Sequence, residues 1–133
     1  MRSTQGLGDK MDFGTFLATL RDAKGWSLRD LEREADDLNH VYIWRLEKGD
    51  RGNPSPEAIE KLLDALKPSA REAQVLKLLL KTPLDDALFQ LIKERSDIPI
   101  EDVEPVATMS FRGKRPSDRD AWLRAIEMVR SFQ

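Results

Sequence analysis

The sequence predicts an all-α protein, and three observations lead to this fold class. Apolar residues recur at helical spacing in successive segments, residues that cap helix N-termini stand before those segments, and Gly or Pro stands where they end. We expect a five-helix domain over residues 11–81 and a smaller domain of three helices over residues 82–133. Residues 1–10 contain no apolar run, so we expect them to form a mobile arm.

The first, fourth and fifth helices of the larger domain have clear signals. Phe13, Phe16, Leu17 and Leu20 form the apolar stripe of a first helix that ends at Gly25. A Ser, a Pro and an acid in succession at residues 55–57 are typical of a helix start, and the stripe of this fourth helix consists of Ile59, Leu62, Leu63 and Leu66. A capping box over residues 69–72 opens a fifth helix that continues to about residue 81.

Residues 27–49 contain two short helical patterns joined by a turn. Ser27 is a good N-cap for a helix whose buried stripe is Leu28, Leu31 and Ala35. Asp36 and Asp37 should end that helix, because Asp tolerates left-handed and turn geometry. Asn39 then caps a second helix, in which Leu38 packs on Ile43 as a hydrophobic staple. Gly49 supplies its left-handed C-terminal cap. This pattern predicts a helix-turn-helix.

The outward face of the second of these helices is poorly suited to water. It consists of His40, Val41, Trp44, Arg45 and Lys48, so large apolar side chains stand beside basic ones. The major groove of DNA suits such a face, because Arg can bond to guanine and Val can contact a thymine methyl group. The alternative is that Val41 and Trp44 pack against other parts of the fold or against a partner chain.

From Phe13 to about Leu66, the chain resembles the XRE group of helix-turn-helix regulators, the lambda-type repressor and Cro family. The matching pieces are Leu20-Arg21, Gly25-Trp26-Ser27, Leu31, Ala35, Tyr42-Ile43, Arg45-Leu46-Glu47-Lys48-Gly49 and Asn53-Pro54-Ser55. The resemblance implies a lambda-repressor-like domain in which Arg21 pairs with Glu47. It also implies that His40, Val41 and Arg45 read bases, helped by Leu28. The chain departs from the family at Asp36-Asp37, where a Gly and a turn one residue shorter are usual.

We therefore expect double-stranded operator DNA as a partner. The expected contact residues come from the two helices and the loop that follows them: Leu28, Arg29, Asn39, His40, Val41, Trp44, Arg45, Lys48, Arg51 and Asn53. In the loop, Arg51 and Asn53 either contact phosphates, which position a protein without specifying sequence, or are simply solvated.

The C-terminal part has three helical segments. One restarts at Thr82-Pro83, one follows the break at residues 97–99, and the last opens at Ser117. About fifty residues rarely bury enough surface to be stable alone, so we expect them to complete their core against a second copy. The interface of this homodimer would include Trp122, Ile126 and Val129, and two recognition helices one DNA turn apart would read a palindrome.

Between the last two helices lies a basic loop, Phe111-Arg112-Gly113-Lys114-Arg115-Pro116-Ser117. Its composition indicates an exposed turn that is either solvated or in contact with phosphates. The Arg-Gly-Lys-Arg-Pro-x-Asp stretch, with Trp122 following, resembles the C-terminal domain of DdrO-type repressors of the DNA-damage response. That resemblance implies that a zinc metallopeptidase of the IrrE/ImmA kind cuts the Phe111-Arg112 bond, the dimer fails and the repressed genes are released. Phe111 departs from the usual aliphatic residue.

Composition narrows the remaining possibilities. The 133 residues include no Cys, are 40% hydrophobic and carry a net charge of −2, so we expect a cytoplasmic protein whose single copy binds DNA weakly. No stretch has the roughly 20 apolar residues of a membrane span. His40 is the single histidine, so we expect no catalytic or metal site, no cofactor and no enzyme activity. The alternative function is an XRE-type antitoxin that binds a toxin protein and regulates its own operon.

Overall fold

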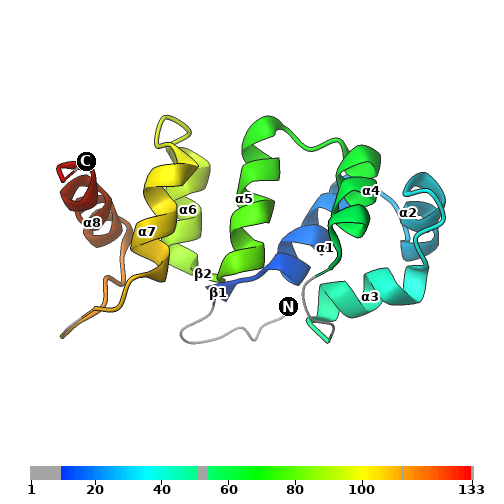
Figure 1. Ribbon diagram of the computed structural model, residues 1–133, viewed down its shortest axis with the longest axis horizontal. Helices are drawn as coiled ribbons and strands as arrows, with labels where there is room; N and C mark the ends of the chain where they lie inside the picture. Colours follow the sequence, from blue (N-terminus) through cyan, green and yellow to red (C-terminus); the bar gives the residue numbers. More distant parts are fainter. Residues whose placement is uncertain (1–9, 51–53, 112, 133) are drawn as a thin grey trace. The chain divides into compact units, whose positions relative to one another are not determined.

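The computed structural model describes residues 10–50, 54–111 and 113–132. The described chain is mostly helical with almost no strand, which confirms the all-α prediction (Figure 1). Its contacts divide it into two units, Asp12–Leu80 and a second unit that joins Lys10 and Met11 to the residues from Lys81 onward. The helices of the first unit are α1 (Phe13–Ala23), α2 (Leu28–Glu34), α3 (His40–Lys48), α4 (Pro56–Leu66) and α5 (Ala70–Lys81).

Local capping interactions set the ends of α2 and α3. The hydroxyl of Ser27 accepts a hydrogen bond from the Asp30 backbone N–H at 3.0 Å, and the Asp30 carboxylate accepts one from the Ser27 N–H at 2.8 Å. Asp36 and Asp37 both adopt the left-handed conformation, with φ of 55° and 62°. Gly49 closes α3 with φ of 78°. The helix-turn-helix expected from the sequence is therefore present, with two Asp residues in its turn.

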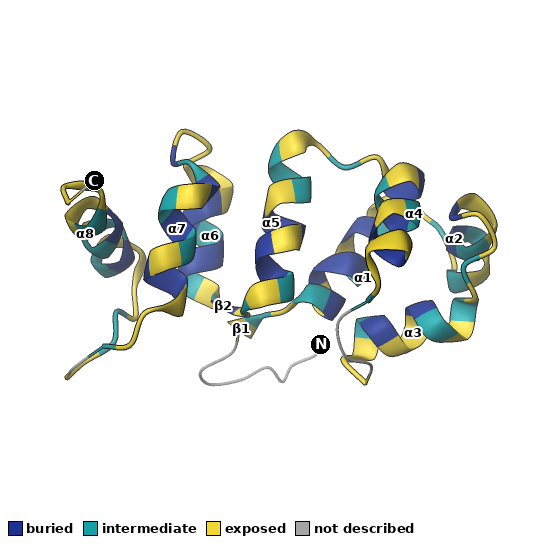
Figure 2. Ribbon diagram, in the orientation of Figure 1, coloured by how far each residue is buried: buried dark blue, intermediate teal, exposed yellow. Residues whose placement is uncertain are grey.

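The core of the first unit is built from one buried side of each helix (Figure 2). Leu17, Leu31, Ile43 and Leu62 are fully buried and come from four different helices. On α1, Gly14 lies directly against the C-terminal end of α3: a Cβ placed on Gly14 would be 2.4 Å from the carbonyl oxygen of Leu46. Only a residue without a side chain permits this approach, so Gly14 helps to fix where α3 lies.

The second unit opens with two strands that the sequence did not predict. β1 (Lys10–Met11) pairs antiparallel with β2 (Leu84–Asp85), with Lys10 opposite Asp85 and Met11 opposite Leu84. Residues 1–9 of the expected arm lie outside the described residues. The helix expected to restart at Pro83 instead begins at Asp86, because Leu84 is buried in the strand.

Three helices complete the second unit: α6 (Asp86–Glu94), α7 (Ile100–Thr108) and α8 (Arg119–Arg130). α8 packs against α6 and α7, and it buries Trp122 and Ile126 completely. Its N-cap is Asp118, whose carboxylate accepts from the Ala121 N–H at 2.8 Å, one residue later than the Ser117 start expected from the sequence. Within the described ranges, no helix combines the length and the apolar character that crossing a membrane requires.

Candidate functional site

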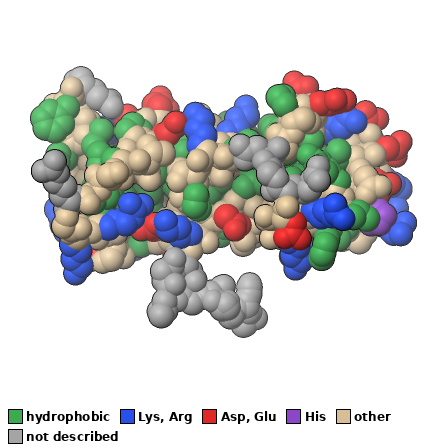
Figure 3. All heavy atoms as spheres, turned by 60° about the horizontal axis from the view of Figure 1, so that its bottom comes forward, with side chains coloured by type: hydrophobic (Ala, Val, Ile, Leu, Met, Phe, Trp, Pro, Cys, Tyr) green, Lys and Arg blue, Asp and Glu red, His purple; other side chains and the backbone are tan. Residues whose placement is uncertain are grey.

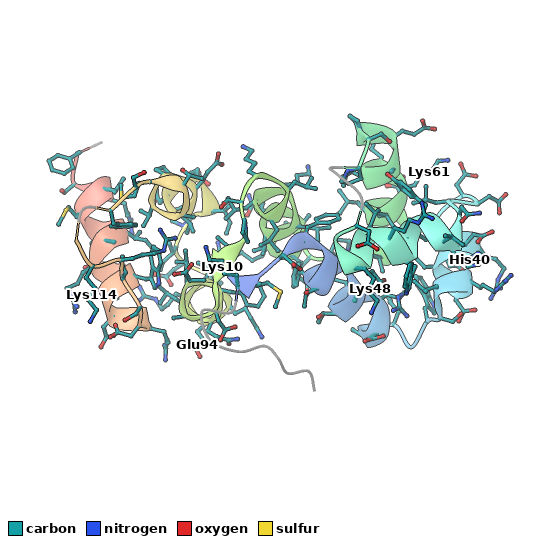
Figure 4. All side chains as sticks on the ribbon, turned by 90° about the horizontal axis from the view of Figure 1, so that it is seen from below. Lys10, His40, Lys48, Lys61, Glu94 and Lys114 are labelled. Atoms are coloured by element: carbon teal, nitrogen blue, oxygen red, sulfur yellow. The ribbon has the colours of Figure 1, made fainter. Side chains whose placement is uncertain are left out.

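The outward face of α3 is the most distinctive surface of the first unit. Val41 and Trp44 are 44% and 42% exposed, and Arg45 and Lys48 are also exposed. The spacing of three and four residues places all four on one side of the helix, and we call them the α3 stripe. Figure 4 shows His40 and Lys48 toward opposite ends of α3. Large apolar and basic side chains therefore share one exposed helix face.

α3 is held from behind by an ion pair to α1. Arg21 Nε donates to Glu47 Oε2 at 2.7 Å and Nη2 donates to Oε1 at 2.9 Å, so the two planar groups form a bidentate pair. Their side chains are only 15% and 7% exposed. Arg21 Nη1 also donates to the carbonyl oxygen of Trp26 at 2.8 Å, and the bond to Glu47 is the main cause that raises the pKa of Arg21. The pair implied by the family resemblance is made.

The N-terminus of α3 is held by two side chains. Asn39 Oδ1 accepts from the backbone N–H groups of Val41 at 2.8 Å and Tyr42 at 3.3 Å. Glu32 Oε1, from α2, accepts from the His40 backbone N–H at 2.8 Å and lies 2.7 Å from His40 Nδ1. These bonds to His40 lower the pKa of Glu32. The role of Glu32 could not be predicted from the sequence, because a pairing across eight residues and a turn leaves no periodic signal.

The other residues expected at the DNA interface differ in their exposure and in their roles. Leu28 is half-buried at the start of α2, whereas Arg29 is exposed beside it. The oxygen of the Asn39 side chain is occupied by capping, so its role is to position α3. Arg51 and Asn53 lie outside the described residues. The structure thus brings together the α3 stripe and His40, with Arg29 on the adjacent helix.

In the second unit, the basic loop is folded onto α8. The ring of Phe111 meets the ring of Trp122 edge-on at 5.9 Å, and the guanidinium of Arg115 lies 5.3 Å from the first ring and 5.1 Å from the second. Arg115 Nε also donates to Asp85 at 3.2 Å, and Asp85 is 3.7 Å from the ammonium of Lys10. Arg112 lies outside the described residues. The loop is therefore anchored on both sides of the expected cleavage bond.

The structure changes which residues of α8 could form the expected dimer interface. Trp122 and Ile126 are fully buried within their own chain, so neither offers a surface to a second copy. Val129 is half-exposed. The exposed apolar side chains of this region are its neighbours Met128 and Phe132, which are 63% and 83% exposed. Helical periodicity showed that one face of α8 is covered, but it did not show that the cover comes from the same chain.

Comparison with known proteins supports the assignment of the first unit. A family model described as a helix-turn-helix domain matches residues 12–76, just under half of the chain. No curated protein matches the sequence. Together with the geometry of α2, the turn and α3, this match supports a DNA-binding helix-turn-helix of the XRE type, as found in DNA-binding regulators.

Proposed function

We propose that this helix-turn-helix protein is a sequence-specific transcriptional repressor that binds a palindromic operator as a dimer. We further propose that it governs a DNA-damage or stress regulon and is inactivated when a metallopeptidase cuts near Phe111-Arg112. The observation that carries the DNA-binding proposal is the α3 stripe, an apolar and basic helix face that is exposed while its backbone is fixed from behind. Figure 3 shows apolar and basic side chains gathered near the single histidine on this end of the first unit.

The chemistry of the α3 stripe fits the major groove. The guanidinium of Arg45 can donate two hydrogen bonds to guanine, and Val41 can contact a thymine methyl group. Lys48, at the C-terminal end of the helix, can reach a phosphate, which positions the helix without specifying sequence. Because the bidentate pair and Gly14 fix α3 on α1, little ordering of the helix backbone is needed when these side chains meet DNA.

Selection from a library of randomised duplex DNA tests this function. The wild-type chain should enrich one palindromic motif whose half-sites are centred about one helical turn apart. A chain with Lys77→Ala, which removes an exposed cation from α5, is the matched control and should enrich the same motif. Enrichment of no motif would contradict the repressor proposal, and it would equally contradict the antitoxin alternative, which must bind an operator to regulate its own operon.

Dimerisation is proposed because the net charge of −2 gives one copy little general affinity for DNA. The apolar side chains that support it are Met128 and Phe132, together with half-exposed Val129. Sedimentation equilibrium should give about twice the chain mass of 15.2 kDa for the wild type. Replacing Met128 and Phe132 by Ser should shift the protein to monomer, whereas Glu101→Ser on α7 should not. A monomeric wild type at micromolar concentrations would contradict the proposal.

Cleavage at Phe111-Arg112 would leave α8 attached by non-covalent contacts alone. These include its apolar packing and the surface ion pairs of Arg115 with Asp85 and of Arg130 with Asp102. The fragment's main anchors are Trp122 and Ile126, each worth roughly 1.5 to 3 kcal/mol of apolar burial. Association of two separate chains costs an estimated 4 to 15 kcal/mol, so these anchors are too few to hold the fragment at low concentration. Met128 and Phe132 leave with it, and the proposed dimer surface is lost.

The cleavage proposal is tested with a zinc metallopeptidase of the IrrE/ImmA kind. Mass spectrometry should find one product that ends at Phe111 and another that begins at Arg112, and binding to the selected motif should fall as these products accumulate. The same enzyme stripped of metal by EDTA is the control. An uncut chain, or a cut elsewhere that leaves binding unchanged, would contradict this mechanism.

A further inference from the structure

His40 is fixed by one carboxylate oxygen from the neighbouring helix. Glu32 Oε1 accepts a hydrogen bond from the His40 backbone N–H at 2.8 Å and lies 2.7 Å from Nδ1 of its ring. The two side chains are 27% and 30% exposed, so the contact lies at the surface where α2 meets the start of α3. Glu32 therefore holds His40 at two points, its backbone N–H and its imidazole ring.

This contact decides which ring atom is available to a ligand. A carboxylate only accepts hydrogen bonds when it is ionised, so Nδ1 must carry the hydrogen that it donates to Glu32. In a neutral imidazole, Nε2 then carries the lone pair and acts as an acceptor. His40 is the first residue of α3, immediately before Val41 of the α3 stripe, and its side chain is 27% exposed, so the ring is accessible at this end of the helix (Figure 4).

We propose that Glu32 is a positioning residue that determines base specificity. It holds His40 in one tautomer and one orientation, so that Nε2 accepts a hydrogen bond from the exocyclic amino group of adenine or cytosine in the major groove. This inference rests on the proposed function, in which α3 lies in that groove. It adds Glu32, a residue of α2 that does not itself touch the base, to the group that sets the sequence read by the protein.

The carboxylate of Glu32 would be repelled by the phosphates of bound DNA, so its presence on this surface requires a compensating role. The geometry indicates two such roles. Glu32 caps a free N–H at the start of α3, which is a structural role, and it holds the ring of His40, which is a role in recognition. The lowered pKa of Glu32 agrees with its ionised state but does not separate the two roles. A readout of base preference does separate them.

The test compares variants by selection from the randomised duplex library. Glu32→Ala and His40→Ala should lose the base preference at one and the same position of the motif, and the double variant should lose no more than either single one. Glu32→Gln should retain the preference, because its carbonyl oxygen can accept from the same two donors. Glu34→Ala, which removes an exposed acid from the same helix, is the matched control and should also retain it.

Base analogues then identify the hydrogen bond. A synthetic duplex with the enriched motif is prepared with purine in place of adenine, or pyrimidin-2-one in place of cytosine, at that position, which removes the amino group. The wild type should bind this duplex about 3- to 10-fold more weakly, as expected for one lost hydrogen bond, and His40→Ala should bind the two duplexes equally. A 7-deazapurine at the same base pair removes an acceptor instead, and it should leave wild-type affinity unchanged.

The outcomes separate this inference from the proposed function. A wild type that enriches no motif overturns both. A wild type that enriches a motif while Glu32→Ala keeps every base preference overturns the role of Glu32 alone. Weaker binding to the 7-deazapurine duplex, but not to the duplex that lacks the amino group, overturns the assignment of Nε2 as an acceptor. Loss of preference at many positions in Glu32→Ala, while His40→Ala loses it at one position only, would show that Glu32 acts only as a structural cap.

Discussion

Replacing Gly14 by Ala should destabilise the first unit, because the added methyl group would meet backbone atoms of α3. A Cβ at this position would lie 2.4 Å from the carbonyl oxygen of Leu46, 2.5 Å from that of Glu47 and 2.8 Å from the Glu47 carbonyl carbon. Ordinary contacts of this kind begin at 3.4 Å, so α1 and α3 would have to separate by roughly 1 Å. No change of rotamer can relieve the clash, since the atoms belong to the backbone.

The size of the effect follows from two opposing contributions. Overpacking of a well-packed contact typically costs about 1 to 3 kcal/mol, and a separation of this size places the cost at the upper end. Ala is favoured over Gly inside a helix by about 0.5 to 1 kcal/mol, which offsets part of that cost. We therefore expect the free energy of unfolding to fall by about 1 to 2 kcal/mol. The separation also lengthens the hydrogen bonds between Arg21 and Glu47.

Urea denaturation followed by tryptophan fluorescence measures this change, because Trp26 and Trp44 report on the first unit. Thr15→Ala, at an exposed position of the same helix, is the control and should change the free energy of unfolding by less than about 0.5 kcal/mol. A Gly14→Ala chain as stable as the wild type, or more stable, would show that α1 and α3 do not approach as closely as described.

Three further predictions concern stability. Glu47→Ala should lower the free energy of unfolding by about 1 to 3 kcal/mol, because Arg21 would be left largely buried and without its main partner, and a double-mutant cycle with Arg21→Ala should show coupling of the pair. Trp122→Ala should cost about 3 to 5 kcal/mol by opening a cavity in the second unit, and near-ultraviolet circular dichroism should show lost packing there. Asp97 is held by Arg95, which lowers the pKa of its carboxyl group from 3.8 to about 2, so its stabilising contribution is present above pH 4 and is lost as the pH falls toward 2. The difference in melting temperature between the wild type and Asp97→Asn should therefore shrink over that range, and a difference that stays constant would refute the prediction.

The features that the sequence predicted well are those with local causes. Ser27, Asn39 and Gly49 cap helices through groups within three or four residues, and the left-handed Asp36 and Asp37 follow from the short polar side chain of Asp. Each of these signals can be read without knowing what lies elsewhere in the chain. The position and outward face of α3 could therefore be predicted.

The features that the sequence did not predict depend on contacts between distant segments. β1 and β2 have two residues each and pair across more than seventy residues of chain, so neither has a recognisable period. Gly14 reads as an ordinary residue of a helix until α3 is placed against it. The spacing of Trp122 and Ile126 predicted a covered face, but a covered face of α8 could be buried by the same chain or by a second copy. Such choices are made by tertiary packing.

The affinity of Arg45→Ala for two duplexes tests most directly whether α3 reads DNA. Fluorescence anisotropy at one fixed salt concentration would compare the selected motif with a shuffled duplex of the same composition. If Arg45 bonds to a guanine, the substitution should weaken binding to the motif by about 1 to 3 kcal/mol, beyond any loss on the shuffled duplex. An equal loss on both duplexes, or no loss on either, would contradict the assignment of α3 as the helix that reads the operator.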